Sequence, residues 1–331
     1  MAKSWTPAEL MDTVRAFQPA CVISAAADMD VFSALDGQPM TALMLAARIG
    51  GHPRSTGILL DALVALELLE KERDVYAVSR TVARLLSANS PDNVLPALRH
   101  QANCLRRWVQ LAQVVQTGKP AQRVPSVRGA QADCEAFIGA MNTFNMAAAP
   151  DIVAKLSGLR FQRLLDIGGA SGTWTIAFLL ARSEARATLF DLPDVIPMAR
   201  ERLTEAGMID RVTLVAGDYN LDEMPGDADL AWLSAVAHQN SREQNRALFA
   251  KICAALADGG ALVIRDVVMD ISRTRPVAGA LFAVNMLVGT EAGNSYMFTE
   301  YRDDLIRSGF ADVELLYEDE RMNSLIFAKK G

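Results

Sequence analysis

Apolar residues recur at helical spacing through most of the first hundred residues of this 331-residue chain. The spacing predicts helices over residues 8–35, 40–49, 54–68 and 80–86. Between the last two helices, a charged turn within residues 69–78 is flanked by short apolar runs, which predicts a small β-hairpin. Three helices followed by a hairpin is the order of a winged helix, so residues 1–100 are expected to form a mainly helical, winged-helix-like domain.

The third predicted helix, residues 54–68, has an apolar far end in which only Asp61 and Glu67 are charged. A DNA-recognition helix needs polar and basic side chains that reach base edges and phosphates. The whole chain also carries a net charge of −6, which disfavours attraction to nucleic acid. An apolar helix surface instead suits packing against another chain. We therefore interpret residues 1–100 as a dimerisation domain and expect no nucleic-acid partner.

The helical pattern continues through the middle of the chain. Helices are predicted over residues 95–116 and, as one or two segments, over 132–156. The loop between them contains residue types that interrupt helices, namely Gly118, Pro120, Pro125 and Gly129. This loop is the best candidate for a flexible joint, and residues 101–157 are interpreted as a helical linker.

From residue 158 onward, short apolar runs rich in β-formers alternate with helical segments. Strands are predicted at residues 163–167, 187–191, 212–216, 230–233 and 261–266. Helices are predicted between them at residues 173–182, 196–206 and 243–256. Strands separated by helices of this length form βαβ units, so the pattern indicates a parallel sheet in an α/β domain.

The last two predicted strands, residues 313–317 and 324–329, break this alternation. Only the charged stretch 318–323 separates them, which is too short for a crossover helix, so they must pair antiparallel as a hairpin. A dinucleotide-binding domain has six parallel strands instead. Five parallel strands plus a terminal hairpin is the pattern of a Rossmann-like, seven-stranded class I methyltransferase sheet, which we predict for residues 158–331.

Composition places the chain among ordinary globular proteins, because 51% of its residues are hydrophobic and 22% are charged. No segment offers about 18 uninterrupted apolar residues, so no membrane span is expected. The polar start of the chain lacks the apolar core of a secretory signal. The chain has four widely spaced cysteines and only three histidines, so we expect reduced cysteines, no metal site and a cytoplasmic protein.

A glycine-rich turn, residues 166–172, follows the first predicted strand and directly precedes a helix. Gly168, Gly169 and Gly172 let the backbone make a tight turn and approach a ligand closely. The spacing does not match the G-x-G-x-x-G dinucleotide fingerprint. Asp166 in this turn suits the positively charged methionine end of S-adenosylmethionine better than a pyrophosphate, so we predict this cofactor.

Acidic residues also end the second and third predicted strands. Asp191, followed by Leu192, is placed to accept both ribose hydroxyls, and Asp218 is placed to accept the adenine amino group, with Tyr219 stacking on the ring. One such residue would be unremarkable as a helix cap. Three acids at the carboxyl ends of three consecutive strands face the crevice where α/β sheets bind ligands, which supports the cofactor prediction.

These motifs resemble those of the plant-type small-molecule O-methyltransferases, a family that includes caffeic acid and acetylserotonin methyltransferases and bacterial natural-product relatives. The resemblance covers nearly the whole chain and is carried by residues 166–169, 190–193, 217–218, 233–238, 285–286 and 309–310. It implies a cofactor contact at Ser234 and a homodimer formed through the N-terminal domain, which closes over the partner's active site.

The resemblance also implies the catalytic residues. The family takes its general base from a His-Asp-Trp motif after the fourth strand, where this chain has His238 followed by Gln and Asn. Two acids orient that base in the family. Asp266 matches the first, whereas Ser295 stands at the second position and Glu291, four residues earlier, is the candidate replacement. A histidine is suited to the role because a phenol is a poor nucleophile at neutral pH.

Substrate contacts are expected from two helices at positions that match the family. The first supplies Met141, Phe144 and Asn145, and the second supplies Phe282, Asn285 and Met286. The leading prediction is thus an S-adenosylmethionine-dependent enzyme that methylates an aromatic hydroxyl of a small molecule. Transfer to sulfur, nitrogen or carbon remains open, as does a relative or regulator that binds the cofactor without methylating.

Overall fold

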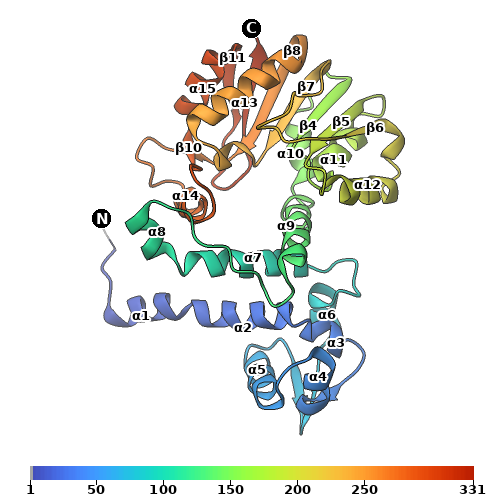
Figure 1. Cartoon of the computed structure of the whole chain (residues 1–331), viewed down its shortest axis with the longest axis vertical. Coiled ribbons are helices and arrows are strands. Elements are labelled where there is room, and N and C mark those ends of the chain that lie inside the picture. Colours follow the sequence, from blue (N-terminus) through green and yellow to red (C-terminus); the bar gives the residue numbers. More distant parts are fainter. Residues whose placement is uncertain (1–2) are drawn as a thin grey trace. The chain divides into compact units, whose positions relative to one another are not determined.

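The computed structural model describes residues 3–331, which fold into two compact units (Figure 1). The first unit contains the chain up to Arg106 together with Arg123–Thr143. The second contains Arg107–Gln122 and Phe144–Gly331. The segment interpreted as a linker from the sequence, residues 101–157, is therefore shared between the two units.

The first unit begins with helices and ends its N-terminal part with a small sheet. The elements are α1 (Pro7–Arg15), α2 (Phe17–Asp28), α3 (Val31–Leu35), β1 (Met40–Thr41), α4 (Ala42–Ile49), α5 (Pro53–Ala65), β2 (Glu70–Glu72), β3 (Val75–Ala77) and α6 (Arg80–Leu86). Antiparallel pairing of β3 with both β1 and β2 gives a three-stranded sheet in the order β1-β3-β2. The predicted order of helices followed by a hairpin is confirmed.

Two details of this unit differ from the sequence prediction. The single helix expected over residues 8–35 is three helices, because it is interrupted at Ala16 and at Asp30, whose φ of 56° is incompatible with an α-helix. Met40 and Thr41 form a strand rather than the start of a helix. The Thr41 hydroxyl then accepts a hydrogen bond from the Met44 N–H at 3.3 Å, so α4 begins only after Thr41.

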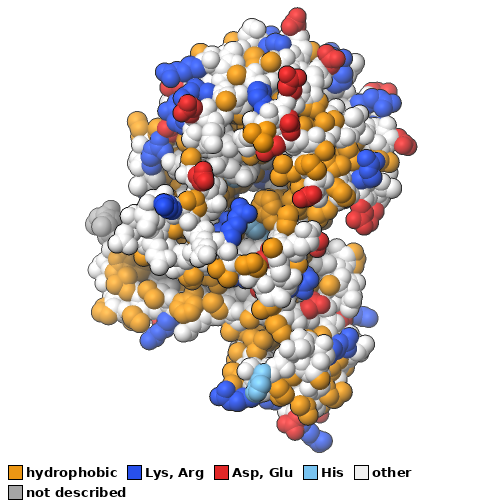
Figure 2. All heavy atoms as spheres, viewed as in Figure 1, with side chains coloured by type: hydrophobic (Ala, Val, Ile, Leu, Met, Phe, Trp, Pro, Cys, Tyr) orange, Lys and Arg blue, Asp and Glu red, His pale blue; other side chains and the backbone are white. Residues whose placement is uncertain are grey.

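The apolar side of α1 is not covered by the chain that carries it. No residue of this helix is buried, although Leu10, Met11 and Val14 are between 47% and 64% exposed. Phe17 at the start of α2 is also exposed, and apolar side chains gather on this part of the molecule (Figure 2). By contrast, α2, α3 and α5 pack around Phe32, which is fully buried. The helix α1 thus presents an apolar surface of its own.

The second unit is built on a seven-stranded sheet. Its strands are β4 (Arg163–Ile167), β5 (Arg186–Asp191), β6 (Val212–Ala216), β7 (Ala228–Ser234), β8 (Leu256–Asp266), β11 (Phe310–Tyr317) and β12 (Ser324–Lys330). They lie in the order β11-β12-β8-β7-β4-β5-β6 (Figure 1). The first five pair in parallel, and β12 runs antiparallel to both β8 and β11. The predicted methyltransferase sheet with its terminal hairpin is confirmed.

Some of the remaining helices precede the sheet along the chain, and others connect its strands. They are α7 (Leu95–Trp108), α8 (Leu111–Thr117), α9 (Ala130–Asn145), α10 (Ala149–Lys155), α11 (Thr173–Ala181), α12 (Ile196–Glu205), α13 (Arg242–Ala255), α14 (Val277–Gly289) and α15 (Phe298–Arg307). The predicted helix over residues 95–116 is broken after Trp108. Short turns η1 (Ile209–Arg211) and η2 (Ala237–Gln239) and a parallel pair, β9 (Val268–Met269) and β10 (Tyr296–Met297), complete the unit.

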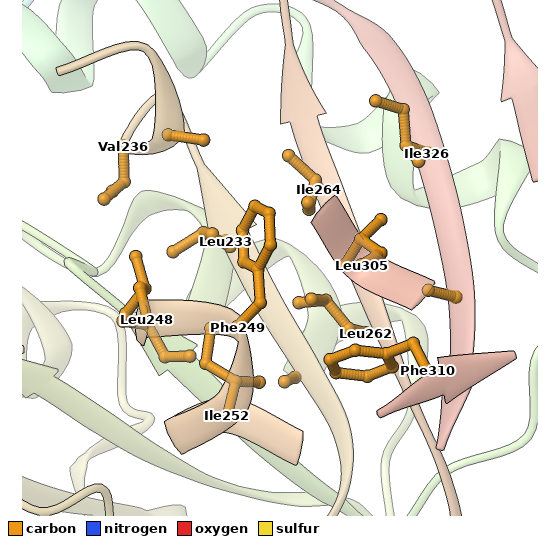
Figure 3. Packing of buried hydrophobic residues seen from close by; sticks show 14 of the residues in the cluster. Leu233, Val236, Leu248, Phe249, Ile252, Leu262, Ile264, Leu305, Phe310 and Ile326 are labelled. Carbon is orange, nitrogen blue, oxygen red and sulfur yellow. The ribbon is translucent and has the colours of Figure 1, made fainter. Parts of the chain in front are cut away.

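Both faces of the sheet are buried, which explains why its strands have nearly continuous apolar sequences. On one face Leu233 and Ile264 pack against Phe249 of α13 and Leu305 of α15 (Figure 3). On the other face Trp232 packs against α10 and α11. Neighbouring residues of β7 therefore point to opposite sides, as the alternation of side chains along a strand requires.

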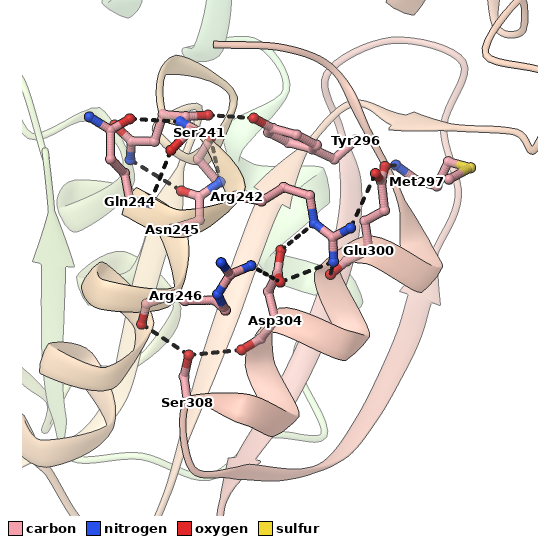
Figure 4. A network of polar contacts seen from close by, with 12 residues as sticks. Ser241, Arg242, Gln244, Asn245, Arg246, Tyr296, Met297, Glu300, Asp304 and Ser308 are labelled. Atoms are coloured by element: carbon pink, nitrogen blue, oxygen red, sulfur yellow. Dashed lines mark hydrogen bonds and ion pairs between the residues drawn. The ribbon is translucent and has the colours of Figure 1, made fainter. Parts of the chain in front are cut away.

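Ion pairs hold α15 against α13 (Figure 4). Another ion pair holds α15 against the loop that precedes α14. Asp304 accepts from Arg242 Nε at 2.8 Å and from Arg246 Nη1 at 3.0 Å. Glu300 accepts from Arg273 Nη2 at 2.6 Å and also caps the Met297 N–H at 2.9 Å. The network fixes the chain that runs from α14 to α15, on which part of the candidate site depends.

Candidate active site

The turn between β4 and α11 can be made only by a chain with glycines at particular positions. Gly168 and Gly172 have φ of 66° and 81°, in the left-handed region that favours glycine. At Gly169 a Cβ atom would lie 2.6 Å from Cγ of Leu189, which no real side chain tolerates. The three glycines thus allow a tight backbone turn that packs closely on the core at the carboxyl edge of the sheet.

Asp191, the last residue of β5, ties this turn to the neighbouring strand. Its Oδ2 accepts the Ala170 N–H at 2.7 Å, and its Oδ1 accepts the Leu192 N–H at 2.7 Å. A carboxylate oxygen has two lone-pair sites, so each oxygen can accept a second hydrogen bond from a ligand. The side chain is therefore held in place and remains able to accept two hydroxyl groups at once.

Asp166 is buried at the end of β4, with 1% of its surface exposed. The Thr175 hydroxyl donates to its Oδ2 at 2.6 Å. Burial, aided by the nearby charge of Asp191, raises the pKa of the Asp166 carboxyl to about 7. A cation next to this group would favour its ionised form, which fits a positively charged ligand group at this place.

Asp218 and Tyr219 follow β6 on the same edge. Oδ1 of Asp218 accepts the Asn220 N–H at 2.8 Å, which forms a tight turn. Tyr219 packs against the core, and its pKa is raised by burial and by the charges of Asp218 and Asp191. The structure therefore brings the three strand-end acids and the tyrosine to one edge, because β4, β5 and β6 are neighbours in the sheet.

Ser234, at the end of β7, is engaged by a buried arginine. Its Oγ accepts from Arg265 Nη1 at 3.0 Å, and the guanidinium of Arg265 lies over the Trp174 ring at 4.6 Å. Burial lowers the pKa of Arg265 to about 10. The hydroxyl of Ser234 is thus already hydrogen-bonded within the protein. A cofactor that contacted this hydroxyl would share it with Arg265.

His238 and Asp266 form a buried pair at the ends of β7 and β8. The turn η2 carries His238, whose Nδ1 lies 2.8 Å from Oδ1 and 3.0 Å from Oδ2 of Asp266. Oδ1 of Asp266 also accepts the Val267 N–H at 2.8 Å. Because a carboxylate only accepts hydrogen bonds, Nδ1 carries the proton and Nε2 keeps its lone pair. This tautomer can take a proton from a hydroxyl group.

The ring of Phe282 on α14 meets the His238 ring edge to face, with centroids 4.7 Å apart. Asn285 lies one helical turn further along, and its Oδ1 accepts the indole N–H of Trp108 at 2.9 Å. Met286 on the same helix is buried. Of the expected substrate residues, Phe282 is therefore in direct contact with the candidate base.

Comparison with known proteins identifies the kind of enzyme that has this arrangement. A family model described as the O-methyltransferase domain matches residues 108–311, and one described as the O-methyltransferase dimerisation domain matches residues 11–88. The chain belongs to the O-methyltransferase family. This membership confirms the predicted enzyme class, an S-adenosylmethionine-dependent O-methyltransferase.

Curated relatives match this O-methyltransferase over nearly its whole length. It is 32% identical, over 93% of this chain and 92% of the other, to the tetracenomycin polyketide synthesis 8-O-methyl transferase TcmO of Streptomyces glaucescens. It is 27% identical, over 92% of each chain, to acetylserotonin O-methyltransferase of Bos taurus. At 28% identity, over 96% of this chain and 93% of the other, it also resembles an N,N-dimethyltransferase, OxyT of Streptomyces rimosus.

Solved structures share the fold of this O-methyltransferase. Human N-acetylserotonin methyltransferase in complex with SAM has a TM-score of 0.81 at 24% identity and covers 100% of both chains. PigF with SAH has a TM-score of 0.84 at 24% identity, with 98% of this chain and 100% of that chain covered. These similarities confirm the class I methyltransferase fold.

The second acid expected beside the base is not found in contact with it. Glu291 of this O-methyltransferase is exposed, and no hydrogen bond or ion pair from it occurs within residues 3–331. Ser295 is buried, and its hydroxyl donates to the Gly279 carbonyl at 2.9 Å, which anchors α14. In the described structure Asp266 is the acid that holds His238, and a role for Glu291 remains a prediction.

The other predicted substrate residues lie on α9. Met141 belongs to the first compact unit, whereas Phe144 and Asn145 belong to the second. Asn145 is buried and Phe144 is exposed. Their contact with a substrate therefore remains a prediction.

Sequence reasoning missed two residues that support the site of this O-methyltransferase. Thr175 donates to Asp166, but a threonine in the first turn of a helix carries no distinct signal. Asn245 of α13 donates to the Ala237 carbonyl at 2.8 Å and accepts from Asn240 Nδ2 at 3.1 Å, which fixes the turn η2. The sequence feature that could have indicated Asn245 was its position, seven residues after His238.

Two further findings concern ligands and membranes. Within residues 3–331 no group of three or more His, Cys, Asp or Glu side chains is placed to hold a metal ion. Among the helices described, none is long and apolar enough to cross a membrane.

Proposed function

We propose that this O-methyltransferase transfers a methyl group from S-adenosylmethionine to a hydroxyl group of a small aromatic molecule, with His238 as the general base. The observation that carries the proposal is the buried pair of His238 and Asp266. Asp266 holds Nδ1 at 2.8 Å, so the lone pair of Nε2 is available for the proton of the acceptor hydroxyl.

A base is needed because a phenol, with a pKa near 10, is a poor nucleophile at neutral pH. His238 is 5% exposed and Asp266 is fully buried. Their interaction is therefore screened little by solvent, and it holds the imidazole ring in one orientation. General-base help of this kind contributes about 10²- to 10⁴-fold to rates.

The residues at the edge of the sheet fit the expected cofactor. Gly168 and Gly169 let the backbone turn tightly at this edge, because a Cβ at either position would crowd Val236 or Leu189. Asp166 would face the positively charged methionine end, Asp191 the ribose hydroxyls and Asp218 the adenine amino group. When bound, S-adenosylmethionine supplies an electrophilic methyl group on a sulfonium ion.

The remaining cofactor contacts are inferred from the positions of side chains along the same edge of the sheet. Tyr219, partly buried beside Asp191, would stack on the adenine, and Leu192, 47% exposed, would cover the ring from outside. Ser234 would contact the cofactor through its hydroxyl group, which also accepts the hydrogen bond from Arg265. These side chains would orient the cofactor relative to His238, which is the main task of an enzyme for an in-line displacement.

The methyl acceptor would lie against α14. Phe282 packs edge to face on His238 and supplies an apolar wall beside the base, and Met286 extends that wall. Such a wall excludes water and favours a flat aromatic substrate. We also propose that the protein acts as a homodimer through its first unit, because residues 11–88 match a dimerisation domain and α1 has an uncovered apolar side.

The proposal is tested by incubating the protein with labelled S-adenosylmethionine and a panel of phenols, thiols and amines. Methylation of phenols alone is expected. Since the relatives include an N,N-dimethyltransferase and an L-tyrosine C(3)-methyltransferase of Streptomyces lavendulae, products on nitrogen or carbon with none on oxygen would reject the hydroxyl acceptor.

The base is tested with the substitution His238→Ala. Loss of turnover by about 10²-fold or more is expected, with the affinity for S-adenosylhomocysteine unchanged, because His238 touches the acceptor side of the site. Turnover that survives at more than about a tenth of the original value would show that the base is another group.

A further inference from the structure

The turn η2, which carries His238, follows a stretch of backbone that needs support from outside. Ala235, just after β7, has φ of 57°, in the left-handed region that alanine seldom adopts. Such a conformation persists only where the surrounding structure holds it. The position of the His238 backbone therefore depends on the groups that pack against η2.

One of these groups is the backbone of the loop after α14. The Asn294 N–H donates to the carbonyl of His238 at 2.9 Å. A Cβ at Gly293 would lie 2.5 Å from the same carbonyl oxygen and 3.0 Å from the carbonyl oxygen of Gln239. Only a residue without a side chain allows so close an approach. The loop thus holds the backbone of the candidate base directly.

Tyr296 holds the residue that ends the turn. Its hydroxyl donates to the Asn240 carbonyl at 2.5 Å (Figure 4). The Tyr296 side chain is buried, and its ring packs edge to face on that of Tyr301, with centroids 5.8 Å apart. Burial, aided by the charges of Glu300 and Asp304, raises the pKa of Tyr296 to about 12. The hydroxyl therefore remains a donor at any pH near neutrality.

The segment of residues 293–296 is anchored in turn to the elements around it. Ser295 stands where the family resemblance places a second acid, and its hydroxyl donates to the Gly279 carbonyl of α14 at 2.9 Å. Tyr296 pairs with Val268 in the small parallel sheet of β9 and β10. Since Val268 is only two residues after Asp266, the segment that supports η2 is also tied to the strand end that carries Asp266.

We propose that residues 293–296 position His238 for proton transfer through hydrogen bonds to the backbone around η2, in place of a second acidic side chain. The inference rests on the proposed function, because it concerns the placement of the proposed base. Tyr296 is a positioning residue, since it acts through the Asn240 carbonyl. A shift of η2 would change the distance from His238 to Asp266 or to the acceptor hydroxyl, and proton transfer needs both within hydrogen-bond reach.

Two substitutions test the inference by kinetics. Tyr296→Phe keeps the buried ring but removes the donor to the Asn240 carbonyl. Gly293→Ala places a methyl group against the His238 carbonyl without removing a side chain. With the phenol that the original protein methylates fastest, kcat is expected to fall about 10-fold in each variant. KM for that phenol and the affinity for S-adenosylhomocysteine should change less than about 2-fold, because neither substitution touches the ligands.

A spectroscopic measurement tests the placement of His238 without turnover. The chain has only three histidines, so labelling them with ¹⁵N gives few signals, and the spectrum of His238→Ala identifies those of His238. The proton on Nδ1, which is hydrogen-bonded to Asp266, exchanges with water only when that contact opens. In both variants this exchange is expected to be about 10-fold faster than in the original protein.

Matched controls separate positioning from a general loss of packing. Tyr76→Phe removes another buried tyrosine hydroxyl, which is hydrogen-bonded to Asp61 at 2.8 Å in the first unit. Gly158→Ala adds a methyl group where a Cβ meets nothing within 4 Å. Both controls should retain kcat and the exchange rate of the Nδ1 proton.

The outcomes distinguish this inference from the proposed function. If the original protein methylates phenols but kcat or the exchange rate is unchanged in Tyr296→Phe or in folded Gly293→Ala, the inference is wrong and the proposed function stands. Equal losses of kcat and of affinity for S-adenosylhomocysteine would show a role in folding alone and would also overturn it. If the Nδ1 proton exchanges faster in both variants while no hydroxyl is methylated, the positioning of His238 stands and the proposed function is wrong.

Discussion

The hydroxyl of Thr175 donates a 2.6 Å hydrogen bond to the carboxyl group of Asp166, and this pair is buried beneath the glycine turn. The turn above it is tight, and the carboxyl group supplies negative charge when ionised. Because burial raises the pKa of Asp166 to about 7, the carboxyl is partly protonated near neutral pH in the absence of a cation.

The first prediction concerns stability and pH. The pKa of Asp166 rises from 3.8 in the unfolded chain to about 7 in the folded one, so folding takes up a proton between these values. The free energy of unfolding therefore contains a term that is present below pH 3.8 and is lost as the pH rises to 7. By linkage this term is at most on the order of 4 kcal/mol.

The substitution Asp166→Asn removes the pH-dependent contribution of this carboxyl group. Between pH 5 and pH 8, the free energy of unfolding of the variant is therefore expected to fall less than that of the original protein. Urea denaturation without S-adenosylmethionine, at these two pH values, measures the difference. The control Asp12→Asn removes a charge from the exposed helix α1 and should keep the original pH dependence. The same pH dependence in Asp166→Asn would show that Asp166 is ionised throughout.

A second prediction concerns the orientation of the base. Asp266→Asn places an amide next to Nδ1 of His238, and its NH₂ group can turn Nδ1 into the acceptor, which moves the proton to Nε2. The histidine then cannot accept the proton of a hydroxyl. We expect kcat to fall by about 10²-fold or more with KM for S-adenosylmethionine changed little. Steady-state kinetics with saturating acceptor provides the measurement.

The control for this variant is Asp270→Asn, four residues further along the chain, where the side chain is exposed and hydrogen-bonded to Ser272. It removes the same charge without touching His238 and should retain nearly full kcat. Equal losses in both variants would mean that Asp266 acts through general electrostatics or folding rather than through the histidine tautomer.

The order of the strands along the chain could be predicted from the sequence, although β8 begins at Leu256 rather than at residue 261 and β11 at Phe310 rather than at residue 313. Strands β4 and β6 have the predicted bounds, because β-rich apolar runs between helices leave few alternatives. The first helix of the chain was predicted less well. The break at Asp30 depends on a single residue with φ of 56°, which the apolar pattern around it does not reveal. Likewise, Met40 and Thr41 pair with β3, and this pairing is non-local.

The residues of the candidate site that lie at or just after strand ends could be predicted from the sequence. Those that lie in loops could not. His238 lies in the turn η2 shortly after β7, and Asp266 ends β8, which is parallel to β7 and next to it, so their closeness follows from the sheet order. Glu291 and Ser295 lie in an irregular segment after α14, where residue spacing does not fix the direction of a side chain. The contact of Trp108 with Asn285 joins residues 177 positions apart, and only the folded structure could reveal it.

The third prediction concerns the glycine turn. In Gly169→Ala the new Cβ would lie 2.6 Å from Cγ of Leu189 and 3.0 Å from Cγ of Asp166. Either the turn or the core beneath it must shift, which is expected to lower the free energy of unfolding by about 1–3 kcal/mol. The affinity for S-adenosylhomocysteine should fall as well, since the displaced backbone forms the proposed binding turn. Denaturation and titration calorimetry measure the two effects.

Gly226→Ala serves as the matched control, because a Cβ at Gly226 meets nothing within 4 Å and its φ is not in the left-handed region. That variant should keep both stability and cofactor affinity. If Gly169→Ala binds S-adenosylhomocysteine as tightly as the original protein while being destabilised, the turn is structural and the cofactor lies elsewhere along the edge.

The last prediction concerns the uncovered side of α1. Leu10 and Val14 are four residues apart, so they lie on one side of the helix, and they are 48% and 64% exposed. If a second copy covers them, the double substitution Leu10→Lys and Val14→Lys buries charge in the interface and weakens the dimer strongly. The fold of a single chain should survive, because no residue of α1 is buried within it. Sedimentation velocity over a range of concentrations measures the shift to monomer.

The control Asp12→Lys reverses a charge on the same helix, at a position that is already polar, and should leave the dimer intact. A stable dimer in the double variant would place the interface on another surface of the first unit.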